Sequence, residues 1–319
     1  MENELEKNVF YGRNITAVKR AAACTIYKMK DAGGEGTMTC YSVFPGIDLL
    51  YNDFYMQSCF SEFRPKVEMI GIDHCRQGRI EWELQNGSYM YLEEGDLQIN
   101  SKENHSMNFG FPLNHYNGIT VAIYIEKAVK TLSDIFGGVW VDLHGLREKF
   151  CARRNPFIMR AEDSIQHIFS ELYTVPGNIR ENYFKIKVLE LLLFLSTVDV
   201  PVNGDERPYF PKRQVETVKA VMKYITENMD KHLTLNELSY RFDIPLTSLK
   251  LCFKGVYGTS VYAYLRSYRM HAAALMLRQS NESIAAIAGR VGYDNSSKFA
   301  AAFRAVMGKS PQEHRNSFV

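Results

Sequence analysis

Closely paired cysteines and long apolar runs are missing from this sequence, and each absence excludes a class of protein. The six cysteines lie far apart, with no Cys-x-x-Cys pair. Because disulfide frameworks and structural zinc sites use closely spaced cysteines, we expect buried free thiols. No apolar run reaches the roughly 18 to 20 residues of a membrane helix. The first seven residues are acidic and no signal-peptide core follows them, so we expect a cytoplasmic protein with no membrane partner.

Charge is distributed unevenly, although the whole chain carries a net charge of only +2. Residues 211–319 contain 16 Lys and Arg against 8 Asp and Glu, a balance of +8. The remaining 22 basic and 28 acidic residues give residues 1–210 a balance of −6. A basic C-terminal third predicts contact with a polyanion, and charge alone fits DNA, RNA or an acidic protein.

The N-terminal part has the periodicity of β-strands. Apolar and polar residues alternate over 66–75 and again over 79–84, and Asn86-Gly87 is a strong hairpin-turn signal. Residues 118–125 are rich in β-branched side chains, as expected for a final strand. Short strands separated by glycine turns predict a small β-sandwich or barrel.

From about residue 128 to 198 the apolar period becomes helical. One stripe contains Ile165, Ile168, Phe169 and Leu172. A second helix at 181–198 carries more apolar surface than one neighbour needs, so packing on the β-domain and a homodimer interface both remain open. Residues 197–211 contain three prolines and a glycine among acidic neighbours, which predicts an interdomain linker.

The C-terminal third contains an internal repeat. The pairs Phe253 and Phe303, Gly258 and Gly308, and Ser260 and Ser310 are each 50 residues apart. In each copy the pattern predicts a helix, a tight turn and a second helix, with Thr234 and Ser283 as N-caps of the first helices. Asp243 and Gly292 stand at the two turns. This arrangement is typical of a helix-turn-helix, in which the second helix enters the major groove of DNA.

These residues carry a resemblance to a known family. Residues 212–319 resemble the DNA-binding domain of the AraC/XylS transcription regulators. The most specific matches are Ile287-Ala288, Val291-Gly292-Tyr293, Phe299, Phe303-Arg304 and Gly308-Lys-Ser-Pro311. The stretch 253–265 resembles a branch that includes siderophore-responsive regulators. The resemblance implies double-stranded DNA and RNA polymerase as partners, and a cupin-like barrel that binds a small effector.

The resemblance also implies which residues face DNA. Many family members have arginine where this chain has Leu251 and Ala301, and arginine is the commonest reader of guanine. The lysines that remain lack the planar fork of arginine. For Thr247 and Ser248 the alternative is simple helix capping. The complete candidate set is Thr247, Ser248, Lys250, Leu251, Lys254, Asn295, Ser296, Ser297, Lys298, Ala301 and Arg304.

The effector site is predicted from the aromatic and polar residues of the β-domain. The expected lining residues are His74, Arg76, Trp82, Tyr89 and Tyr91, although alternation prevents Trp82 and Glu83 from both facing inward. We rank an aromatic or apolar organic effector first and a ferric siderophore second.

The sequence also bears on whether the protein is an enzyme. Metal-binding cupins use His-x-His, whereas Cys75 and Arg76 follow His74 here. Ser-His-Asp arrangements and phosphate-binding glycine loops are also missing from the sequence. We therefore expect no catalytic residue, metal or cofactor, with a cupin-type metal-dependent enzyme fused to a DNA-binding domain as the alternative.

Together these observations predict a multi-domain α+β protein. A cupin-like β-barrel effector domain is expected at 1–130, a helical segment with a possible dimer interface at 131–198, and a linker at 199–211. Residues 212–319 are expected to form an all-α DNA-binding domain of two helix-turn-helix units.

Overall fold

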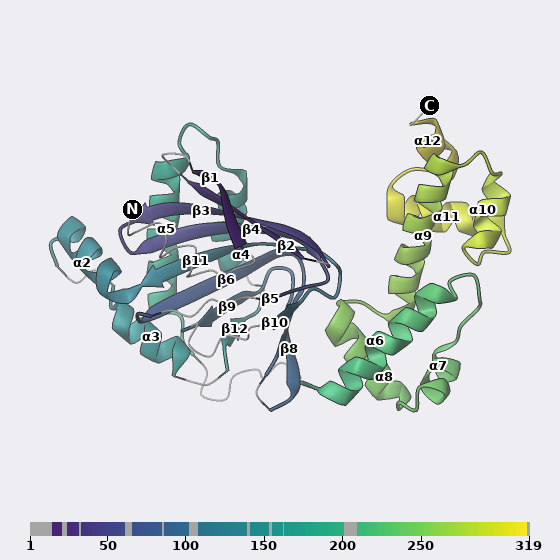
Figure 1. Ribbon diagram of the computed structural model, residues 1–319, viewed down its shortest axis with the longest axis horizontal. Helices are drawn as coiled ribbons and strands as arrows, with labels where there is room; N and C mark the ends of the chain where they lie inside the picture. Colours follow the sequence, from purple (N-terminus) through teal and green to yellow (C-terminus); the bar gives the residue numbers. More distant parts are fainter. Residues whose placement is uncertain are drawn as a thin grey trace. The chain divides into compact units, whose positions relative to one another are not determined.

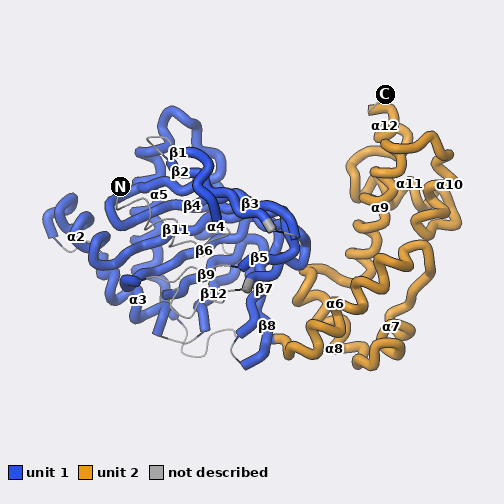
Figure 2. The backbone as a smooth tube through the Cα atoms, in the orientation of Figure 1, with its two compact units in different colours: residues 1–209 blue, residues 210–319 orange. Residues whose placement is uncertain are grey.

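The computed structural model describes residues 15–20, 24–31, 33–60, 66–84, 86–101, 108–138, 141–152, 155–161, 163–200 and 209–317. The chain divides into two compact units, residues 1–209 and residues 210–319 (Figure 2). The first unit combines strands and helices, and the second is almost entirely helical (Figure 1). Residues 201–208 of the predicted linker lie outside the described residues.

Two antiparallel sheets form the framework of the first unit. The strands of the larger sheet follow the order β1-β2-β3-β4-β11-β6-β9-β12, and the smaller sheet contains β8-β7-β10-β5. The larger sheet comprises β1 (Ile15–Arg20), β2 (Thr25–Asp31), β3 (Gly34–Phe44), β4 (Ile47–Met56), β6 (Met69–Gly78), β9 (Leu97–Asn100), β11 (Tyr116–Tyr124) and β12 (Phe157–Met159). The smaller sheet comprises β5 (Ser58–Phe60), β7 (Ile80–Glu83), β8 (Ser88–Leu92) and β10 (Asn108–Gly110).

Strand alternation gives the larger sheet two different apolar faces. On β6, Ile70 and Ile72 belong to the core beneath the helices, whereas Met69 and Cys75 belong to a second core shared with the smaller sheet. The register between β6 and β11 places Val121 opposite Ile72, and both belong to the core beneath the helices. The side chains of the two cores therefore stay on opposite faces of the sheet. The region between the sheets is therefore a separate apolar compartment.

Helices cover the other face of the larger sheet. They are α2 (Ile125–Phe136), α3 (Leu143–Cys151), α4 (Asp163–Thr174) and α5 (Arg180–Thr197) (Figure 1). The predicted stripe of α4 is confirmed, since Ile165, Ile168, Phe169 and Leu172 are all buried. One side of α5 also packs into this core through Leu191.

The second unit begins with β13 (Phe210–Pro211) and continues as helices arranged around a long central helix, α9 (Val261–Gln279). Before it come α6 (Lys212–Glu227), α7 (Leu235–Arg241) and α8 (Leu246–Tyr257); after it come α10 (Ile284–Arg290), α11 (Ser296–Met307) and α12 (Pro311–Asn316). The predicted repeat thus corresponds to two helix pairs, α7–α8 and α10–α11.

The helix caps and turn residues that the sequence predicted for the repeat are present in the structure. Thr234 caps α7 in a capping box with Glu237, and the Ser283 side chain accepts a hydrogen bond from the Ala286 N–H of α10. The turn residues Asp243 and Gly292 both have left-handed backbones, with φ of 47° and 77°.

The second helices of the two pairs end alike. Gly258 and Gly308 share φ 76° with ψ −9° and −10°, and each donates its N–H to the carbonyl four residues earlier. Both copies therefore use the same helix stop.

None of the six cysteines, all of which the structure describes, forms a disulfide, and four of them are buried. Among the helices that the structure describes, none is both long and apolar enough to cross a membrane.

Candidate nucleic-acid interface and ligand pocket

The second helices of the two pairs present equivalent exposed faces. On α8, Phe253 is buried while Leu251 and Lys254 are exposed. On α11, Phe303 is buried while Ala301 and Arg304 are exposed. The exposed candidates on both helices are Thr247, Lys250, Leu251, Lys254, Ser296, Ser297, Lys298, Ala301 and Arg304. Each helix thus has an apolar face inside the protein and a polar, basic face in solvent.

The starts of α8 and α11 differ. Pro245 is the N-cap of α8, without a side-chain cap bond, so Thr247 and Ser248 are not its caps. Thr247 is exposed and Ser248 is half-buried. Asn295 caps α11, where its Oδ1 accepts from the Ser297 and Lys298 N–H groups, both at 2.9 Å. Asn295 therefore fixes the start of α11 while Thr247 points a free hydroxyl outward.

The cations of these faces are available for an external anion. Within the described part of the chain, Lys250, Lys254, Lys298 and Arg304 have no carboxylate within ion-pair distance. Elsewhere in the same unit, Lys223 pairs with Glu227 at 3.9 Å. Four basic side chains on the exposed faces of α8 and α11 are thus without a carboxylate partner in the described residues.

A residue outside the predicted set connects the two helix pairs. Arg269 of α9 donates from Nε to the Met229 carbonyl at 2.7 Å and from Nη2 to the Lys231 carbonyl at 2.8 Å. Its guanidinium also lies 5.8 Å from the ring centroid of Tyr293, beside the turn of the second pair. Arg269 thereby fixes the end of α6 against the second pair. No sequence signal pointed to Arg269, because its hydrogen-bond partners are backbone carbonyls.

A family model matches most of the second unit. Residues 238–317 match the family model described as a helix-turn-helix domain. The HTH-type transcriptional activator RhaR of Yersinia pseudotuberculosis is 28% identical over 104 residues, which cover 33% of this chain and 36% of RhaR. RhaR of Mannheimia succiniciproducens is 25% identical over 105 residues, covering 33% and 38%. The chain thus spans little more than a third of the length of these curated relatives. Residues 238–317 thus form a helix-turn-helix domain.

Two solved structures differ in how much of this chain they cover. The C-terminal domain of AraT, a response regulator from Geobacillus stearothermophilus, is 31% identical and covers 32% of this chain and 84% of its own, with a TM-score of 0.31. Apo ToxT from Vibrio cholerae is 12% identical and covers 85% of this chain and 98% of its own, with a TM-score of 0.31.

The first unit contains a pocket of about 150 Å³ between its two sheets. Trp82 lies in its wall, with Phe109 edge-on at a centroid distance of 6.4 Å. Phe54 and Phe111 stack at 5.5 Å in the same lining. The complete lining is Ile15, Met29, Met38, Leu50, Asn52, Phe54, Cys59, Met69, Asp73, Ile80, Trp82, Phe109, Phe111, Tyr116, Thr120, Ala122 and Tyr124.

The predicted effector residues are only partly brought together. Trp82 lines the pocket, whereas Tyr89 and Tyr91 pair across the small sheet with Glu83 and Glu81, on its opposite face. The Tyr91 hydroxyl donates to Glu81 at 2.7 Å. Successive side chains of a strand point to opposite faces of the sheet, so the residues next to an inward-facing side chain point away from the pocket.

His74 and Arg76 lie on the helix-covered face of the larger sheet. The His74 ring stacks on Phe169 at 4.2 Å, its Nδ1 is 3.2 Å from the Tyr173 hydroxyl, and only 2% of the residue is exposed. Burial lowers the pKa of His74 to about 4, so the ring is neutral near pH 7. Arg76 lies over the Tyr173 ring at 4.5 Å. These two residues connect the sheet to α4 instead of lining the pocket.

The polar part of the pocket consists of residues that sequence reasoning missed. Asn52 donates from Nδ2 to Thr120 Oγ1 at 2.9 Å, and Thr120 donates to Asp73 Oδ1 at 2.8 Å. Asn100 donates to the other oxygen of Asp73 at 3.4 Å. The alternation of β6 was the available signal, since Asp73 must face opposite to His74.

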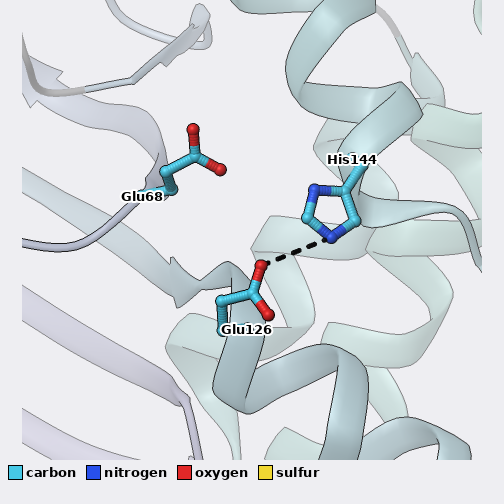
Figure 3. Close-up of side chains that lie close together, drawn as sticks. All are labelled: Glu68, Glu126 and His144. Atoms are coloured by element: carbon cyan, nitrogen blue, oxygen red, sulfur yellow. Dashed lines mark ion pairs between the residues drawn. The ribbon is translucent and has the colours of Figure 1, made fainter.

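A second group of titratable side chains lies on the surface of this unit. Glu68, Glu126 and His144 come together at the start of β6, α2 and α3 (Figure 3). His144 Nε2 is 3.7 Å from a Glu126 oxygen, and Arg147 lies 3.5 Å from Glu68. All three residues are exposed, and these ion pairs account for the cluster as a surface link between helices and sheet.

Proposed function

We propose that this protein is an AraC-type transcription regulator that reads DNA through α8 and α11 and responds to a small effector between the two sheets. The observation that carries the DNA-binding part is the matched pair of exposed basic faces, with Lys254 and Arg304 at equivalent positions. Helices of this kind insert into successive major grooves about 34 Å apart. Its partners would be double-stranded DNA and RNA polymerase in the cytoplasm.

The centre of each reading face is apolar. Leu251 is 59% exposed in the middle of α8, and the exposed Ala301 stands at the equivalent place on α11. Apolar side chains in the major groove contact the C5-methyl group of thymine. We propose that Leu251 and Ala301 read thymine where an arginine would read guanine, and that Thr247, Ser297 and the nearby cations contact bases and phosphates.

The pocket supports an organic effector over a ferric siderophore. An apolar cavity of 150 Å³ accommodates a molecule the size of benzene, and this pocket has about that volume. A hexadentate iron chelate is several times larger. Binding would act by favouring one of two arrangements of the chain, to the extent that the effector binds them unequally.

A homodimer through α5 completes the proposal. Ile186 is 61% exposed and Leu193 is 46% exposed, seven residues apart on the side of α5 that the sheet leaves uncovered. A stripe with this spacing suits pairing with a second helix. In sedimentation experiments the protein should form dimers at micromolar concentration, and the double change Ile186→Glu, Leu193→Glu should give folded monomers. A monomeric unmodified protein would remove the interface.

The salt dependence of DNA binding tests the reading faces. Affinity for a 30-base-pair duplex, selected from a randomised library, would be measured from about 50 to 200 mM salt. Lys254→Ala and Arg304→Ala should each reduce the slope of log K against log[salt] by roughly 0.9, since each removes a phosphate contact. Lys223→Ala removes an exposed cation that pairs with Glu227, and should leave the slope unchanged. An unchanged slope in both reading-face variants would remove these helices from the interface.

A further inference from the structure

The two helix pairs of the second unit share one helix, α9, and its two ends pack on different pairs. Near its start, the Tyr264 ring centroid lies 5.9 Å from that of Phe253 on α8. From Met270 onward, the buried side chains of α9 belong to the core formed with α10 and α11. Arg269 stands between these two stretches. Resting on the proposal that α8 and α11 read DNA together, we propose that Arg269 is a positioning residue that fixes the spacing between the two reading helices.

One guanidinium connects α9 to both helix pairs. Its Nε and Nη2 atoms donate to the carbonyls of Met229 and Lys231, at 2.7 and 2.8 Å, in the segment between α6 and α7. Its central carbon lies over the Tyr293 ring, 5.8 Å from the centroid, just after the turn between α10 and α11. Because the guanidinium is planar and rigid, contacts along its edge and across its face fix its position and its orientation.

The backbones of the two pairs meet at the same place. A Cβ built on Gly292 would lie 2.7 Å from Arg269 Nη2 and 2.9 Å from the Asp230 carbonyl oxygen. The turn of the second pair therefore lies directly against the guanidinium and against the segment that leads into α7. We call residues 229–231, Arg269 and residues 292–293 the α9 joint.

The α9 joint is connected to both reading helices. On one side, Tyr293 packs edge-on against Phe299 of α11, with a centroid distance of 5.8 Å. On the other side, α6 packs against α8, and Tyr224 of α6 contacts Phe242 at the end of α7 at 5.7 Å. A shift at the joint would therefore move α8 relative to α11, so a protein without the guanidinium contacts should tolerate more than one spacing between its two half-sites.

The test compares two duplexes that differ only in the distance between their half-sites. One is the selected 30-base-pair duplex, and the other has one base pair inserted between the half-sites, which moves one of them by about 3.4 Å and turns it by about 35°. We define the spacing penalty as the ratio of the two dissociation constants. For the unmodified protein we expect a penalty of roughly 100-fold, since one mismatched base pair alone costs about 5- to 150-fold.

Variants on one helix assign the penalty to one side chain. Arg269→Met keeps much of the apolar stem but removes the donors, and should lower the penalty by roughly tenfold, within the range for side chains that couple two sites. Arg266→Met replaces an exposed arginine on the same helix and should keep the full penalty. Arg269→Lys retains the charge without the planar fork and should give an intermediate value.

The ratio separates positioning from a general structural role. Lower stability, or the loss of a phosphate contact, weakens binding to both duplexes equally and leaves the penalty unchanged. A full penalty in Arg269→Met would overturn the positioning role and leave the reading of two grooves intact. The absence of a penalty in the unmodified protein would overturn the reading of two grooves, and the positioning role with it.

Discussion

The proposed recognition of thymine by Leu251 can be tested at the level of a single methyl group. The Leu251 side chain is 59% exposed on α8, so its truncation to alanine removes no core contact and should leave stability within about 0.5 kcal/mol. If the side chain covers a thymine methyl in the complex, it buries one methyl group worth about 0.8 kcal/mol, or roughly fourfold in affinity.

Uracil substitution provides the assay, because uracil is thymine without that methyl group. Fluorescence anisotropy would measure binding to the selected duplex with each thymine replaced in turn. One replacement should cost roughly fourfold with the unmodified protein and nothing with Leu251→Ala. Leu251→Arg should shift the preference at that base pair toward guanine. If every uracil replacement has the same effect on the protein and on Leu251→Ala, the thymine contact does not exist.

Two further predictions concern stability. Gly292→Ala should destabilise the second unit by about 1 to 3 kcal/mol, because φ is +77° and the new Cβ would lie 2.8 Å from the Met229 carbonyl oxygen. Gly289→Ala, where nothing lies within 4 Å of the new Cβ, should be neutral or stabilising; urea unfolding of both variants checks this. The pKa of His74 is lowered from 6.5 to about 4, so the unfolded chain binds a proton first as the pH falls. Stability should therefore decrease from pH 6.5 to pH 4, by roughly 3 kcal/mol from this residue. Unfolding measured across this range should show a weaker pH dependence in His74→Phe, and an identical dependence would contradict the assignment.

The sequence predicted those features that depend on residues close together along the chain. Thr234 and Ser283 are caps because their side chains bond within one turn of helix, and Gly292 and Asp243 are turns because few residue types accept their backbone conformation. The 50-residue repeat then located the exposed faces, since Phe253 and Phe303 must be buried if the two copies share one packing.

The pocket could not be predicted in the same way. Alternation shows that Asp73 and His74 face opposite sides, but the side that helices cover depends on α4, far along the chain. His74 was expected in the pocket and instead packs on Phe169. Trp82 lies in the pocket lining, while Arg269 was missed because its hydrogen-bond partners are backbone carbonyls, which carry no sequence signal.

The proposal that one chain reads two successive major grooves with α8 and α11 predicts a specific hydroxyl-radical footprint. The full-length protein bound to its selected duplex should protect two patches whose centres lie about 10 base pairs apart on one face of the DNA. Arg304→Ala should weaken the protection of one patch and Lys254→Ala that of the other. A single protected patch, or two patches that weaken together in both variants, would contradict the account.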